Sequence, residues 1–396
     1  MSLRIRRLAR PRALVAGLLL PAATLVARDA TGARPEGSVV AREETGTAAV
    51  ATTPARDAPG PAVEDSIWVF TNRARTDGAW SARPDTVTTA LRTFHVTPLR
   101  TDPVPFEVRL RVTSVAQQRL PRDTMLEALR AATVRSGRPL VLHVHGYATG
   151  FDEATEEAAE MRHRARYDGP VAVFAWPARS MGVTWPARGR WLTNAYWQDA
   201  EMAAASADEL ADVLHDLVRT LGADQVVLSA HSMGNQLVAA TLERADVRAL
   251  LTASPLRAVA FVSPDLDRAR FRDEVVPTAR PLATRLVLYG ARNDHMLRIA
   301  SIVHDGPRAG FFEAEGEWPH GLDDVERVDI TNGRVAAPWL GAWTDTNHAL
   351  RRHGTALADL FGVVAGDMPA PADARCALPS GAISDAASPA CSGLRE

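Results

Sequence analysis

The sequence predicts an α/β fold, with a mostly parallel central sheet and helices on both of its faces. Two observations carry this prediction. Short apolar runs, typical of fully buried parallel strands, recur along the middle of the chain, for example at residues 139–144 and 225–232. Stretches with apolar residues at helical spacing lie between them, for example at 194–221. The 396 residues suffice for one large domain with extensions.

The first predicted elements precede this alternating region. Residues 67–70 form a short apolar run that predicts a strand, and 93–96 and 106–112 are expected to form a strand pair. In 106–112, apolar residues alternate with other, mostly charged ones, the pattern of a strand with one buried face. A helix is expected at 123–132.

The alternating region supplies the sheet and its covering helices. Strands are expected at residues 139–144, 171–176, 225–232, 258–263, 285–289 and 325–330, and helices at 152–167, 194–221 and 235–242. Acidic residues in the first turns of 152–167 suit a helix start, because the helix dipole favours negative charge there.

The N-terminus, residues 1–30, is predicted to be an export signal. An arginine-rich head precedes the apolar run 13–27, and small residues follow near the expected cleavage point. The run is too short to predict a membrane span. We therefore expect an exported protein, periplasmic or secreted, with no stable membrane span. An uncleaved N-terminal anchor is the alternative.

The flanking regions differ in composition from the predicted domain. Residues 31–64 lack sustained periodicity and predict a disordered linker, followed by one domain over 65–365. Residues 366–396 are rich in Ala, Pro and Ser and predict a flexible tail without regular structure. The only two cysteines, Cys376 and Cys391, lie in this tail, where export favours a disulfide between them.

The composition excludes several kinds of chemistry. A net charge of −2 gives no reason to expect nucleic-acid binding. The chain contains no lysine, which removes lysine nucleophiles and Schiff bases from consideration. No cysteine lies within the predicted domain, so a thiol nucleophile is excluded there. We expect neither a metal nor an organic cofactor.

The segment Ala230-His231-Ser232-Met233-Gly234 has the pattern of a nucleophile elbow. An apolar strand runs into Ser232, a helical pattern follows it, and the positions two before and two after the serine are small. Such a turn exposes the serine hydroxyl beside a helix N-terminus. A serine that only caps the next helix is the alternative.

A serine nucleophile needs a histidine base, and the histidine needs a carboxylate. Asp294 follows the strand at 285–289 and is the predicted acid, although it would equally serve as a helix N-cap. His348 follows the last strand and is the predicted base. The competitors are Asp265 and Asp267 for the acid, and His353, His320 and His231 for the base. The His231 side chain is expected to point away from the site.

An oxyanion hole needs two backbone N–H donors. Met233, the residue after the serine, is expected to supply one. Gly146 follows the strand at 139–144 and allows a close approach, so Tyr147 or Ala148 is expected to supply the other.

Several short motifs together resemble the bacterial α/β-hydrolase family DUF900 over about residues 67–360. They are His145-Gly146-Tyr147, Phe174-Ala175-Trp176-Pro177, Ala230-His231-Ser232-Met233-Gly234-Asn235, Ser263-Pro264-Asp265-Leu266-Asp267 and Asn293-Asp294. The resemblance implies the α/β-hydrolase fold and a triad of Ser232, Asp294 and His348. The chain departs from the family at Asn347-His348-Ala349, where the family usually has a Gly-His-Ser-type motif.

Together these features predict an exported serine hydrolase, esterase-like, that cleaves a small-molecule acyl ester through an acyl-enzyme. Acyl transfer by the same triad is the alternative among enzymes. A non-catalytic binding module that retains the fold is the alternative from another class.

Overall fold

A computed structural model describes residues 61–99, 109–179, 190–312, 322, 325–331, 348, 354–366 and 382–383. The predicted export signal, most of the predicted linker, and Cys376 and Cys391 lie outside these residues. No helix among the described residues is long and apolar enough to cross a membrane.

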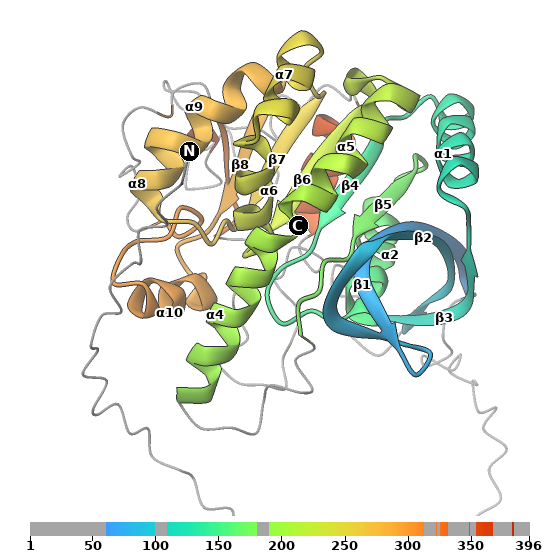
Figure 1. Cartoon of the computed structure of the whole chain (residues 1–396), viewed down its shortest axis with the longest axis horizontal. Coiled ribbons are helices and arrows are strands. Elements are labelled where there is room, and N and C mark those ends of the chain that lie inside the picture. Colours follow the sequence, from blue (N-terminus) through green and yellow to red (C-terminus); the bar gives the residue numbers. More distant parts are fainter. Residues whose placement is uncertain are drawn as a thin grey trace, which may run out of the picture. The chain divides into compact units, whose positions relative to one another are not determined.

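Within the described residues, ten strands form one sheet in the order β10-β9-β8-β7-β6-β4-β5-β1-β2-β3. Figure 1 labels β1 to β8. The strands are β1 Val63–Thr76, β2 Ala79–Leu99, β3 Arg109–Arg119, β4 Leu140–Val144, β5 Val171–Phe174, β6 Val226–His231, β7 Ala258–Val262, β8 Leu286–Gly290, β9 Glu326–Asp329 and β10 Ala382–Ile383. Neighbours from β10 to β1 pair in parallel, whereas β2 is antiparallel to β1 and β3. The predicted mostly parallel sheet is confirmed.

Helices cover both faces of this sheet. The α-helices are α1 Arg122–Ser136, α2 Phe151–Ala165, α4 Arg190–Ala205, α5 Ala207–Leu221, α6 Gly234–Leu242, α7 Ala245–Ala253, α8 Arg268–Arg270, α9 Val276–Ala279, α10 His295–Val303 and α11 Gly354–Ala358. Helices α1, α5, α6 and α7 pack in one apolar core with Leu140 and Leu142, and α2 and α11 in a second with Val141. Successive residues of β4 therefore enter different cores, which is why its sequence is apolar throughout.

The antiparallel strands are longer than predicted. The prediction placed strands at 67–70 and 93–96, but β1 and β2 form one long hairpin whose turn is Asp77-Gly78. Both turn residues have positive φ, 52° and 82°, as a tight hairpin turn requires. The parts of β1 and β2 nearest this turn contain polar and charged residues without a continuous apolar run, so the local pattern does not predict strands there.

Two other predictions were wrong. The single helix expected at 194–221 is divided into α4 and α5 at Ser206. The Ser206 hydroxyl accepts a hydrogen bond from Asn72 Nδ2 of β1 at 2.9 Å and donates to the Met202 carbonyl. This contact with β1 is invisible in the local sequence. The tail expected to lack regular structure contributes β10, which pairs with β9.

Candidate active site

Ser232 lies at the sharp turn between β6 and α6. Its φ of +52° is in the left-handed region that non-glycine residues rarely adopt, as a nucleophile elbow requires. A Cβ at Gly234 would lie 2.5 Å from the His145 carbonyl oxygen, so a larger residue does not fit there. The alternative in which Ser232 only caps the helix is not observed, because Met233 holds the N-cap position.

Asn235 braces this turn from inside. Its Nδ2 group lies within hydrogen-bond distance of the carbonyl oxygens of Ala230 (3.1 Å), Ser232 (3.0 Å) and Val262 (3.2 Å), and its side chain is buried. These bonds connect both sides of the elbow to the end of β7. The local sequence gives no signal of these contacts, because Val262 is 27 residues away in the chain.

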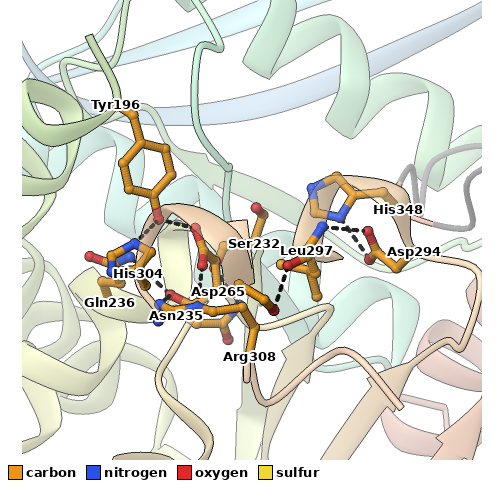
Figure 2. Close-up of polar contacts among 11 residues, drawn as sticks. Tyr196, Ser232, Asn235, Gln236, Asp265, Asp294, Leu297, His304, Arg308 and His348 are labelled. Atoms are coloured by element: carbon orange, nitrogen blue, oxygen red, sulfur yellow. Dashed lines mark hydrogen bonds and ion pairs between the residues drawn. The ribbon is translucent and has the colours of Figure 1, made fainter. Parts of the chain in front are cut away.

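The predicted acid and base meet. His348 Nδ1–H donates to Asp294 Oδ2 at 2.8 Å, across 54 residues of chain. Asp294 is fully buried, and its Oδ1 accepts the Leu297 amide at 2.9 Å as the N-cap of α10. One carboxylate therefore both caps α10 and accepts the hydrogen bond from His348. In the view of Figure 2, the His348 imidazole lies between Asp294 and Ser232.

The surroundings of His348 favour its protonated form. Burial acts to lower the pKa of His348, but the charge and hydrogen bond of Asp294 outweigh it, aided by Asp265 and Glu157. The net effect raises the pKa above its ordinary value of 6.5. An imidazole that accepts a proton during a reaction is stabilised by the same carboxylate.

The competing carboxylates are engaged elsewhere. Asp265 Oδ1 accepts from Arg308 Nε at 2.7 Å, and Asp265 Oδ2 accepts from the Tyr196 hydroxyl (Figure 2). Asp267 caps α8 by accepting the Arg270 amide at 2.9 Å. Neither contacts His348 through a hydrogen bond between described residues.

The expectation for His231 was wrong. Instead of pointing away from the site, its Nε2–H donates to the His348 carbonyl oxygen at 2.6 Å. The local sequence gives no signal of this contact, because the partner of His231 is 117 residues away in the chain. His320 and His353 lie outside the described residues.

Of the two backbone amides expected as oxyanion donors in the loop after β4, one is already engaged in a hydrogen bond. The Ala148 amide donates to Asp199 Oδ2 at 3.3 Å, so it is already engaged. Within the described residues no hydrogen bond engages the amide of Tyr147 or of Met233. A Cβ at Gly146 would lie 3.1 Å from Ser232 Cβ, so the glycine lets this loop approach the elbow.

Two buried charges hold this loop against its neighbour after β5. Arg73 donates to the Thr149 carbonyl at 2.8 Å and to the Ala178 carbonyl at 2.7 Å. Asp199 accepts the amides of both Ala148 and Arg179. Burial raises the Asp199 pKa to about 6 and lowers the Arg73 pKa to about 10. Together they support Ala148 at its strained φ of +53°.

Among the described residues, no cluster of His, Cys, Asp and Glu side chains is arranged to hold a metal ion. The chemistry available at this site is that of a serine, a histidine and a carboxylate, beside two backbone N–H groups.

Residues 123–320 match the family described as "Alpha/beta hydrolase of unknown function (DUF900)". The chain belongs to this family. The predicted resemblance is confirmed, and the sheet has the mostly parallel order of the α/β-hydrolase fold. The family membership supports a hydrolase.

Solved structures similar to this chain include several esterases. An esterase from Pyrobaculum calidifontis matches at 11% identity and a TM-score of 0.32, covering 76% of this chain and 85% of its own. A cold-adapted esterase from an Arctic intertidal metagenomic library matches at 11% identity and a TM-score of 0.30, covering 74% and 93%. Puromycin hydrolase matches at 15% identity and a TM-score of 0.30, covering 71% and 37%. No curated protein matches the sequence.

Proposed function

We propose that this protein is an exported serine hydrolase, esterase-like, that acts on a small-molecule acyl ester. The observation that carries the proposal is the 2.8 Å hydrogen bond between His348 and Asp294 beside a serine held at positive φ. A serine hydroxyl becomes a useful nucleophile only with such a base and orienting acid.

In the proposed mechanism Ser232 Oγ attacks the ester carbonyl carbon while His348 Nε2 takes the hydroxyl proton. Asp294 keeps the Nδ1–H tautomer and stabilises the imidazolium. The amides of Met233 and Tyr147 bind the oxyanion, and the N-terminus of α6 adds a favourable dipole.

The imidazolium then gives its proton to the departing alcohol, leaving the acyl group on Ser232. His348 next takes a proton from water, which attacks the acyl carbon. Collapse of the second tetrahedral intermediate releases the acid and returns the proton to Ser232.

Labelling by a fluorophosphonate probe tests the proposal. We expect the wild-type protein to be labelled and to hydrolyse p-nitrophenyl esters, and Ser232→Ala to do neither. Ser263→Ala is the matched control, because Ser263 is also buried at a strand end and has a φ of +41°. Its variant should still be labelled. A wild-type protein that is neither labelled nor active on esters would refute the proposal and favour a binding module.

A further inference from the structure

We propose that His231 is a positioning residue that holds the backbone of the catalytic base. This inference rests on the proposed function. The bond from His231 Nε2–H to the His348 carbonyl oxygen is 2.6 Å long, and the two rings lie 4.8 Å apart at 50°. His231 therefore contacts the base from the side of the nucleophile, whereas Asp294 contacts it from α10.

His231 is well placed for this task because it is the last residue of β6. This strand pairs with β4 on one side up to Ala230 and with β7 on the other side up to His231, so both neighbours hold it close to its end. The His231 side chain is buried, with 8% of its surface exposed. One rigid strand end thus carries both Ser232 and the residue that anchors the base.

The two bonds to His348 do different things. The bond from Asp294 fixes the rotation of the imidazole ring but leaves the position of the His348 backbone undetermined. The bond from His231 fixes the carbonyl, and with it the point from which the side chain extends. Since misplacing a catalytic group by about 1 Å can lower a rate about 100-fold, fixing the backbone has a direct effect on turnover.

The hydrogen-bond partner of His231 defines which of its ring nitrogens carries the hydrogen. A carbonyl oxygen only accepts hydrogen bonds, so His231 Nε2 carries the hydrogen. Burial lowers the pKa of His231 to about 4, with a smaller contribution from the charge of His348. His231 is therefore neutral at neutral pH and places no second positive charge beside the imidazolium that forms on His348.

Gly146 makes room for this arrangement. A Cβ on Gly146 would lie 3.2 Å from His231 Nδ1, closer than most such contacts. The glycine that lets the β4 loop reach the elbow therefore also leaves space for the His231 ring.

The test compares His231→Leu, which removes the donor, with His231→Gln, whose amide can still donate to the carbonyl. We expect His231→Leu to lower kcat and the fluorophosphonate labelling rate about 10- to 100-fold with KM little changed. His231→Gln should retain kcat within about threefold. His143→Leu is the control for replacing a buried histidine, since His143 lies on β4 without a side-chain hydrogen bond to any described residue. It should leave kcat unchanged.

A proton NMR spectrum gives a second measurement that folding defects alone do not mimic. The hydrogen-bonded Nδ1 proton of His348 should give a low-field resonance in the wild type and in His231→Gln, and a broadened one in folded His231→Leu. If His231→Leu does not fold, His231→Asn replaces it, because its shorter amide does not reach the carbonyl.

Equal kcat values for the Gln and the Leu or Asn variants would overturn the positioning role. A wild type that is not labelled would instead refute the proposed function, so the two failures are distinguishable.

Discussion

The loops after β7 and β8 both carry a buried aspartate, yet the two carboxylates have different surroundings. Both oxygens of Asp265, in the loop after β7, accept hydrogen bonds: one from Arg308 and the other from Tyr196. Asp294, in the loop after β8, accepts one hydrogen bond from the first turn of α10 and another from His348. A position at the edge of a parallel sheet therefore does not decide which carboxylate contacts a histidine; the side chains that pack around each carboxylate do.

The charge balance of the two sites differs in the same way. Asp265 and Arg308 form an ion pair in which the side chains are only 3% and 4% exposed. Asp294 has no arginine bonded to it among the described residues, so its charge acts on His348. The Asp265 carboxylate is therefore neutralised by a buried arginine, whereas under the proposed function the Asp294 carboxylate would act on the His348 imidazole.

Replacing Asp294 by Asn should give the largest effect. We expect kcat for p-nitrophenyl ester hydrolysis to fall about 1,000-fold or more, because the amide no longer supports the tautomer and the imidazolium of His348. Steady-state kinetics on folded protein measures this. If Asp265→Asn lowered kcat as much while Asp294→Asn did not, the assignment of the two sites would be reversed.

The same variant has a signature in the pH profile. A base works in its neutral form, and the raised pKa of His348 predicts that wild-type kcat/KM falls as the pH drops through a value above 6.5. In Asp294→Asn burial acts with less opposition, so this acidic limb should move to lower pH. A limb that stays in place would show that Asp294 does not set the His348 pKa.

Replacing Asp265 by Asn should mainly affect stability. It leaves Arg308 buried without its counter-charge, and breaking a buried ion pair typically costs about 3–5 kcal/mol of unfolding free energy. Urea unfolding followed by circular dichroism measures the loss. The folded fraction should keep kcat within about tenfold, since the Asp265 backbone amide still donates to the Ser232 carbonyl.

Tyr196→Phe should give the smallest effect. Its hydroxyl donates to Asp265 and accepts from His304 Nε2 at 2.8 Å, joining α4 to the loop after β7 and to the end of α10 (Figure 2). Loss of the hydroxyl should lower the unfolding free energy by about 1 kcal/mol, with kcat nearly unchanged. A loss as large as that for Asp265→Asn would mean that the hydroxyl, and not Arg308, stabilises the carboxylate.

Local pattern predicted the sheet and the elbow because both depend on residues close in sequence. The apolar run of β6 and the small residues Ala230 and Gly234 carry that information. The order of elements also placed Asp294 and His348 at the same edge of the sheet, although their catalytic roles stay predictions. The partners of Asp265 were not predictable, because Tyr196 and Arg308 are 69 and 43 residues away. The bond from His231 and the division of the long helix at Ser206 depend on tertiary contacts in the same way.

The double use of Asp294 has a consequence for the entropy of the site. Because Oδ1 is held by the first turn of α10, the carboxylate is confined to one rotamer whether or not His348 is present. The remaining oxygen already points at the place that the imidazole takes. The Asp294 carboxylate is therefore ordered by the formation of the helix, and the His348 imidazole meets an acceptor that is already preorganised.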